Sequence, residues 1–191
     1  VAGRVAEGQA AIAAAGLEKQ MRAEVGWIEA IPAADASVDF IWCRDMLNHV
    51  ADLSAGLAEC YRVLRPGGRM LVYQTFGTPL LEPQEAAFLY QTLSIIPRNQ
   101  SHNFFEETAR SVGFEIQEKD PIASEWREAW EEDGSHNTSR QLLRIARLRR
   151  NREELIQLVG ESDYQIELAD CTWGVYQMLG KLCPTVYVLA K

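Results

Sequence analysis

The stretch VDFIWCRDMLNHV at residues 38–50, read together with RPGGRMLVYQT at residues 65–75, decides the fold of this chain. An apolar run that ends at Cys43 predicts a strand, and the polar residues Arg44, Asp45 and His49 follow it closely. A helical pattern then leads to RPGG, where the chain turns into a second apolar run. Parallel strands joined by a helix end at the same edge of their sheet, where ligands bind in open α/β folds. The stretch therefore predicts a ligand site just beyond Cys43.

The rest of the chain alternates between helical and strand patterns, which is typical of an α/β fold with a largely parallel sheet. The strand at 38–43 has few polar residues, so we expect it to be covered on both faces. We expect Asp52 to cap the next helix, because its carboxylate can accept the free amide hydrogens of the first turn. The other predicted elements are a helix over 1–15 ended by Gly16, a strand over 21–25, a helix starting at Pro83, a helix with a capping box at Asn103 and Glu106, a strand over 114–117, helices over 124–182 and a final strand over 185–190.

Composition and charge narrow the classes of function. The 191 residues are 47% hydrophobic and 24% charged, as in one globular domain, and the net charge of -8 argues against nucleic-acid binding. No apolar run is long enough to cross a membrane, and the first residues lack the layout of a signal peptide. The four cysteines are scattered, without a CxxC pair or a histidine cluster. We therefore expect reduced cysteines, no metal site and a cytoplasmic protein.

Residues 23–76 carry several features in a fixed order: the loop with Pro32, the strand VDFIW, the turn LNHVAD, the helix end YRVLRPGG and the strand after it. In this order and spacing the segment resembles the class I S-adenosylmethionine-dependent methyltransferases, above all the group that includes the ubiquinone and menaquinone C-methyltransferases. ARSVGFEIQE at 109–118 resembles the penultimate helix and strand of that family, and TVYVLAK at 185–191 resembles its terminal antiparallel strand. The resemblance covers residues 1–120 and 184–191.

The resemblance implies a Rossmann-like, doubly wound, mostly parallel sheet with an antiparallel terminal strand and a helical insertion. The glycine-rich loop and the acidic residue that follow the family's first two strands have no counterpart here, so those first strands are missing from this sequence. Gly67 and Gly68 do not replace the loop, because they follow a helix and enter a strand. We expect a natural N-terminal region upstream of Val1. Without it, the unpaired strand edges require a partner chain, a swapped segment or a rearranged sheet.

The resemblance also divides the chain and implies an activity. Residues 1–123 and 184–191 are predicted to form the methyltransferase core, and residues 124–183 a helical insertion that supplies an acceptor pocket or lid. The implied reaction is methyl transfer from S-adenosylmethionine to a small-molecule acceptor by in-line displacement, which depends mainly on alignment of the reactants. The alternative is a non-catalytic methyltransferase-like module that acts through dimerisation or protein binding. A homodimer is compatible with both functions, and a dehydrogenase fits less well because no GxGxxG loop exists.

Candidate cofactor contacts are the positions that match the family. Trp27 stands where the family often has an acidic residue; it can stack on adenine but cannot accept its hydrogen bond, so Glu29 is the replacement acceptor. Arg44 follows the fourth strand of the family pattern, beside the cofactor, and the alternative for it is a surface salt bridge with Asp45. The predicted cofactor-binding residues are Trp27, Ile28, Glu29, Cys43, Arg44 and Asp45.

One residue is a candidate for catalysis and four are candidates for contact with the substrate. His49 is the general base if the acceptor is a hydroxyl or a carbon acid, since imidazole exchanges protons near neutral pH; otherwise it only completes the turn before the helix. Aromatic pairs at helical spacing either wall a pocket or pack in the core. The basic cluster from Arg140 to Arg152 either attracts an acidic substrate or forms a solvated face, and Asp170 interrupts an apolar stretch. The predicted substrate contacts are His102, in a polar loop, and Trp126, Trp173 and Tyr176.

Overall fold

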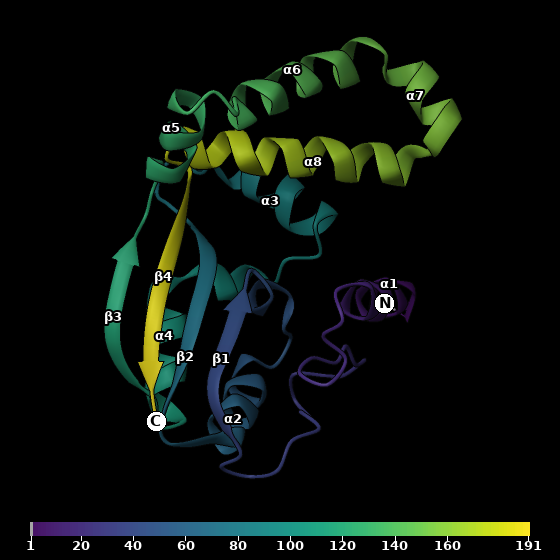
Figure 1. The fold of residues 1–191 in the computed structure, drawn as a ribbon. Helices are drawn as coiled ribbons and strands as arrows, with labels where there is room; N and C mark the ends of the chain where they lie inside the picture. The colour runs from purple at the N-terminus through teal and green to yellow at the C-terminus, as the bar shows by residue number, and fades with distance from the viewer. Residues whose placement is uncertain (1) are drawn as a thin grey trace.

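A computed structural model of the protein describes residues 2–191. Its sheet has the strand order β1-β2-β4-β3 (Figure 1). The strands are β1 (Val38–Arg44), β2 (Leu64–Gly77), β3 (Glu115–Pro121) and β4 (Leu182–Ala190). β1 pairs with β2 in parallel, and β4 is antiparallel to both β2 and β3, so every strand except β4 runs in one direction. The predicted α/β class with an antiparallel terminal strand is confirmed.

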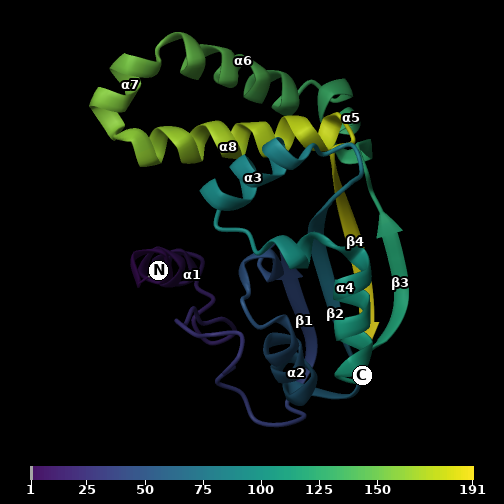
Figure 2. The ribbon, with the colours of Figure 1, turned by 180° about the vertical axis from the view of Figure 1, so that it is seen from behind.

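Helices cover one face of this sheet and cross one of its ends. α2 (Leu53–Val63) and α4 (His102–Ser111) contact each other on one face (Figure 2). A layer of helices crosses the end at which β1 and β2 finish, and it consists of α3 (Pro83–Thr92), α5 (Glu125–Glu132), α6 (Asn137–Arg150), α7 (Arg152–Val159) and α8 (Glu161–Met178). Short 3-10 turns span Leu47–His49 and Pro97–Gln100. α1 (Ala2–Ala14) stands apart from the sheet.

The helix boundaries follow local chemistry. Asp52 caps α2 as predicted, because its Oδ1 accepts from the backbone N–H of Ala55 at 3.0 Å. Pro83 occupies the first turn of α3, where its missing N–H costs nothing. The predicted capping box at Asn103 is wrong: Ser101 is the cap of α4, and its hydroxyl accepts from the N–H of Phe104. The helix therefore starts earlier than the sequence spacing indicated.

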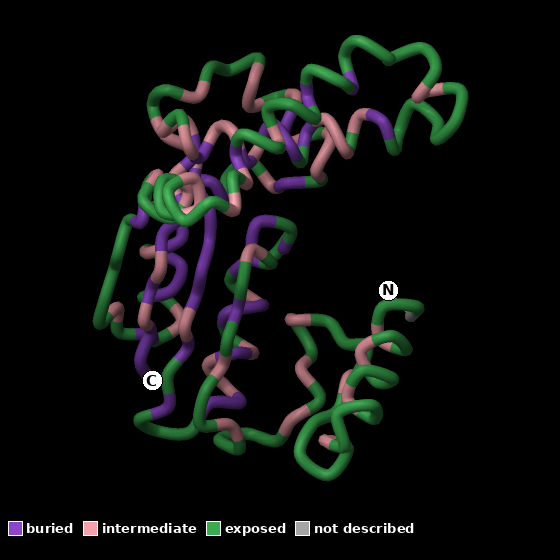
Figure 3. The backbone as a smooth tube through the Cα atoms, turned by 45° about the horizontal axis from the view of Figure 1, so that its top comes forward, coloured by how far each residue is buried: buried purple, intermediate pink, exposed green. Residues whose placement is uncertain are grey.

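Two groups of buried side chains hold the layers together. The larger lies between the sheet and α2 and α4, and its fully buried members include Leu57, Phe76, Phe105 and Tyr187. A smaller group around Leu89, Ala169 and Leu182 joins α3 and α8 to β4. Figure 3 shows the buried backbone concentrated in the central strands, whereas α1 and the segment after it are mostly exposed.

Two predictions about the N-terminal part are wrong. Residues 21–25 form no strand, and Met21 and Val25 are 52% and 58% exposed. A short alternating segment has nothing to hold it extended when no strand lies beside it. β1 is also not covered on both faces: it is an edge strand, and Phe40 and Trp42 are 52% and 66% exposed. Its apolar sequence thus leaves one face open among the described residues.

Glu85 links three elements and predicts a response to acid. Its carboxylate accepts from Lys181 Nζ at 2.5 and 2.6 Å and from Tyr176 Oη at 2.8 Å, which ties α3 to α8 and to the start of β4. The hydrogen bond from Lys181 lowers the pKa of Glu85. A folded pKa below the unfolded value adds stability that is present above the unfolded pKa and is lost as the pH falls through the folded pKa.

We therefore expect Glu85→Gln to flatten the fall in unfolding free energy that sets in as the pH drops below the ordinary glutamate pKa of 4.5 and continues through the lowered pKa of Glu85. Urea unfolding at several pH values measures this slope. Glu107→Gln is the matched control, because Glu107 is an exposed carboxylate without an ion pair among the described residues. A slope that Glu85→Gln leaves as steep as in the wild type would show that the carboxylate is not a source of acid sensitivity.

Candidate functional site

The ends of β1 and β2 lie side by side, as the sequence predicts. Cys43 is paired with Val72, and Arg44 with Tyr73. The chain then leaves β1 through Asp45, whose backbone is left-handed with φ 48°. Asp and Asn tolerate this conformation better than most residues. The backbone N–H of Asp45 still donates to the Tyr73 carbonyl at 2.7 Å, so the turn starts from a closed strand pair.

The Asp45 side chain joins the two strand ends. Its Oδ1 accepts from the backbone N–H of Thr75 at 3.0 Å, from the Thr75 hydroxyl at 3.2 Å and from the Asn48 amide at 3.4 Å. Burial raises the pKa of the Asp45 carboxyl, and the two hydrogen bonds from Thr75 oppose that shift. The carboxylate therefore fixes the loop after β1 against β2.

Buried amides hold the next turn, which carries His49. Asn99 Nδ2 donates to the carbonyls of Leu47 and Val50, each at 2.8 Å, and Gln100 Nε2 donates to Asn48 Oδ1 at 2.8 Å. Asn48, Asn99 and Gln100 are all buried, where such hydrogen bonds resist competition from water. The turn is thus held by residues that lie far along the chain, between α3 and α4.

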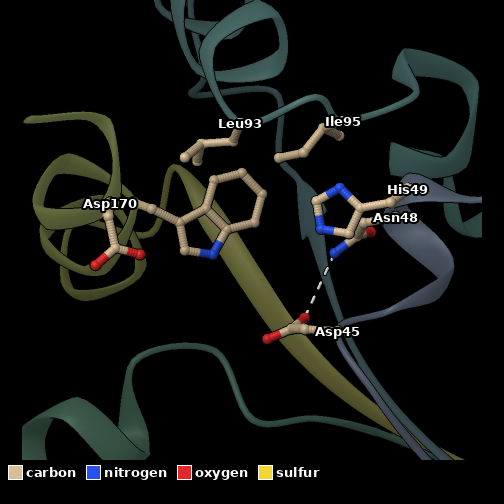
Figure 4. Close-up of a pocket in the computed structure, with 7 residues that line it drawn as sticks. Asp45, Asn48, His49, Leu93, Ile95 and Asp170 are labelled. Carbon is tan, nitrogen blue, oxygen red and sulfur yellow. Dashed lines mark hydrogen bonds between the residues drawn. The ribbon is translucent and has the colours of Figure 1, made fainter. Parts of the chain in front are cut away.

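A pocket of about 240 Å³ opens beside this turn (Figure 4). The carbonyl of Ser94 lies 3.0 Å from His49 Nδ1. A carbonyl oxygen only accepts, so Nδ1 carries the hydrogen of the neutral ring and Nε2 remains an acceptor. The lining residues come from the loop after β1, from the segment after α3 and from α8: Asp45, Asn48, His49, Leu93, Ile95, Asp170 and Trp173.

A second pocket, of about 380 Å³, lies on the side of the exposed N-terminal segment. Trp27, Ile28, Cys43 and Met46 line it together with the carboxylate-bearing Glu24. Burial raises the pKa of Cys43 to about 11, so its thiol is a neutral, apolar part of the wall. An indole face, an apolar wall and one carboxylate acceptor suit a flat heteroaromatic ring with polar edges, so these residues fit the adenine end of S-adenosylmethionine.

The structure thus brings together part of the predicted site. Trp27, Ile28 and Cys43 line one pocket, and Asp45, His49 and Trp173 line the other. Glu29 is exposed and lines neither, and Glu24 takes the place in the wall that Glu29 was expected to hold. No pattern in the sequence singles out Asn48, Leu93 or Ile95. Asp170 stood out as a charge in an apolar stretch, and it is exposed at the first pocket.

Four other predicted residues make contacts outside these two pockets. Arg44 lies 5.7 Å above the ring of Tyr73 and forms no ion pair with Asp45. Trp126 stacks on the same Tyr73 ring, with the two ring centres 5.3 Å apart. His102 stacks on Phe76 and its Nδ1 lies 2.8 Å from Tyr187 Oη, and burial lowers the pKa of His102. Tyr176 donates to Glu85.

Residues 2–191 contain neither a cluster of metal ligands nor a membrane-spanning helix. Within that range, no three His, Cys, Asp or Glu side chains gather closely enough to hold a metal ion. No helix of the same range has the length and apolar character needed to cross a membrane.

Comparisons with known proteins agree on one kind of domain. Residues 4–72 match the family described as "Methyltransferase domain". The chain is 33% identical over 90 residues to the ubiquinone/menaquinone biosynthesis C-methyltransferase UbiE of Psychromonas ingrahamii, covering 43% of this chain and 36% of that protein. It is 44% identical over 54 residues to dimethylglycine N-methyltransferase of Parasynechococcus marenigrum, covering 28% of this chain and 19% of that protein.

The whole fold also has solved relatives. A geranyl diphosphate methyltransferase in complex with SAM superposes with a TM-score of 0.70 at 16% identity, covering 100% of this chain and 65% of that one. At this level of identity the likeness concerns the fold alone. The aligned part spans about a third or less of the length of the curated relatives, 36% of one and 19% of the other.

Proposed function

Because residues 4–72 match a methyltransferase domain and the fold is shared with solved methyltransferases, we propose that this chain is a class I S-adenosylmethionine-dependent methyltransferase of the UbiE-like type that transfers a methyl group from S-adenosylmethionine to a small-molecule acceptor. One observation carries the proposal. The four-residue segment from Cys43 to Met46 separates two pockets: Cys43 and Met46 line the larger, and Asp45 lines the smaller. A methyl donor in one pocket and a methyl acceptor in the other would meet across this short segment, at the ends of the strands. Alignment of the two reactants there supplies most of the catalysis.

The larger pocket is the proposed cofactor site. Trp27 offers its ring to adenine, Ile28 and Cys43 form the apolar wall, and Glu24 supplies a hydrogen-bond acceptor. Arg44 and Asp45 are proposed to border the methionine end, because they follow directly on this wall. When bound, S-adenosylmethionine supplies an electrophilic methyl group on a sulfonium sulfur.

The smaller pocket is the proposed acceptor site. Leu93, Ile95 and Trp173 exclude water, and His49 Nε2 is free to take a proton from a hydroxyl or an acidic carbon. Asp45 fixes the loop on which His49 stands, so its role is to position that side chain. α8 contributes Asp170 and Trp173, which supports residues 124–183 as the part of the chain that completes the acceptor pocket. His102, Trp126 and Tyr176 as substrate contacts stay predictions.

The cellular location is also a proposal. All four cysteines are free thiols, and two of them, Cys43 and Cys60, are buried in the larger core. Free thiols are typical of a reducing compartment, which supports the cytoplasm.

A titration with S-adenosylhomocysteine tests the cofactor site. We expect calorimetry to show saturable binding that Trp27→Ala weakens about three- to tenfold, since an aromatic stacking contact contributes about 0.5–1.5 kcal/mol. Leu158→Ala is the matched control, because Leu158 is 78% exposed and Trp27 is 77% exposed. Equal losses of affinity in the two variants would show that Trp27 does not contact the cofactor.

Activity itself needs a second assay. Tritium-labelled S-adenosylmethionine, offered with panels of hydroxyl, carbon-acid and amine acceptors, should label at least one class. If the protein binds S-adenosylhomocysteine but labels no acceptor, the non-catalytic module is the better description. If it binds no S-adenosylhomocysteine at all, the proposed function fails.

A further inference from the structure

Arg127 of α5 is a half-buried cation that forms no direct ion pair among the described residues. Its Nε donates to Gln177 Oε1 at 2.9 Å and its Nη1 donates to Gln141 Oε1 at 2.8 Å. The guanidinium carbon lies 5.3 Å from the centre of the Trp130 ring. Throughout residues 2–191, no carboxylate lies within ion-pair distance of it. Neutral amides and an indole therefore orient this group, and the carboxylates of Asp170 and Glu131 act on its charge only from beyond ion-pair distance.

The open side of Arg127 faces a cleft of about 350 Å³ between α5, α6 and α8. The lining contains no carboxylate: it consists of Arg127, Asn137, Arg140, Gln141, Arg144 and Cys171. Arg140 has no ion pair among the described residues, and Arg144 pairs with Glu167 at 2.9 Å. The cleft is therefore a local excess of positive charge in a chain whose net charge is -8.

The Gln141 side chain, which contacts Arg127, lies against α8 at a glycine. A Cβ at position 174 of α8 would collide with the side-chain amide of Gln141, so glycine is needed there for the amide to lie against the helix. Gln141 in turn holds the Arg127 guanidinium through its carbonyl oxygen, which leaves its amide N–H groups as donors. Burial lowers the pKa of Arg127, because removal from water disfavours the charged form of the guanidinium. A bound anion would offset that loss of hydration.

We propose that this cleft binds the oxyanion of a small molecule, a carboxylate or a phosphate, and that Arg127 and Arg140 are its principal ligands. A guanidinium matches both groups through two parallel hydrogen bonds. The overall acidity of the chain disfavours an extended polyanion, so the ligand is small. Asp170 and Cys171 are consecutive on α8 and line the acceptor pocket and this cleft respectively, so the two sites lie on neighbouring sides of one helix.

The test is a titration followed in 1H–15N spectra at the arginine Nε–Hε signals, without any cofactor. Sodium phosphate and sodium acetate are titrated separately at constant ionic strength, with sodium chloride as the compensating salt. We expect a saturable shift of the Arg127 signal with at least one of the two anions, and the preferred anion identifies phosphate or carboxylate. We expect Arg140→Gln, an exposed position that should not affect folding, to weaken this binding about tenfold or more.

Two further variants complete the test. Arg147→Gln is the matched control, because Arg147 is an exposed arginine of α6 that does not line the cleft, and it should bind as the wild type does. Gly174→Ala should also weaken the binding, because it displaces Gln141 and with it Arg127. A shift that does not saturate, that chloride alone reproduces, or that Arg147→Gln reduces as much as Arg140→Gln would overturn the proposal. Because no cofactor is present, these outcomes are independent of the methyl transfer proposed above.

Discussion

Replacement of His49 by asparagine is expected to lower kcat by about 10²- to 10⁴-fold with a hydroxyl or carbon-acid acceptor, while KM changes little. The imidazole Nδ1 donates to the Ser94 carbonyl, and an asparagine amide can make the same hydrogen bond. The substitution therefore removes only the Nε2 acceptor that faces the pocket. The fall in kcat therefore reports the loss of proton transfer, because the conformation of the turn is kept.

The measurement uses tritium-labelled S-adenosylmethionine with the hydroxyl or carbon-acid acceptor that the wild type turns over fastest. His136→Asn is the control: His136 is an exposed histidine at the N-terminus of α6, and its φ of 51° suits asparagine. If His49→Asn keeps its turnover within about threefold of the wild type, the ring is only a structural part of the turn and the base lies elsewhere.

Phe76→Ala is expected to reduce the free energy of unfolding by about 3–5 kcal/mol. Phe76 is fully buried near the end of β2, with its ring 3.9 Å from that of His102, 5.9 Å from Phe105 and 6.1 Å from Tyr187. Removal of the ring leaves a cavity between β2, β4 and α4, and these elements cannot move enough to fill it. Small domains are stable by only about 5–15 kcal/mol, so the loss is a large share of the total.

Urea unfolding followed by circular dichroism measures the effect. Phe40→Ala is the control, because Phe40 lies on the exposed face of β1 at 52% exposure, and we expect it to cost less than about 1 kcal/mol. Similar losses in the two variants would mean that the core around β2 is not the main source of stability.

The sequence was informative where one local rule decides the structure. The run from Val38 to Thr75 combines apolar periodicity, the cap at Asp52 and the RPGG turn, and these agree on strand, helix and strand. The rule that ligands bind at strand ends selected Asp45 and His49, and both line a pocket. Local chemistry was misleading at residues 21–25, because whether an alternating segment becomes a strand depends on a neighbour.

The rest of the site depends on contacts that local patterns do not contain. Ile95 and Trp173 meet His49 only because α3 and α8 cross the end of the sheet, and nothing in the spacing of those residues predicts that crossing. Arg127 was hidden for a similar reason, since only the folded chain places Gln141 and Gln177, and no ion-paired carboxylate, beside it. The division of the chain at residues 123 and 184 remains a prediction.

The buried thiols make convenient chemical reporters. Cys43 belongs to the wall of the larger pocket and Cys171 to that of the arginine cleft, and burial raises the pKa of both. Alkylating reagents attack the thiolate, which at a pKa of about 11 is only about one part in 10⁴ at neutral pH. The modification rate of each thiol therefore follows the opening of its own pocket, and protection of one without the other would reveal which pocket a compound occupies.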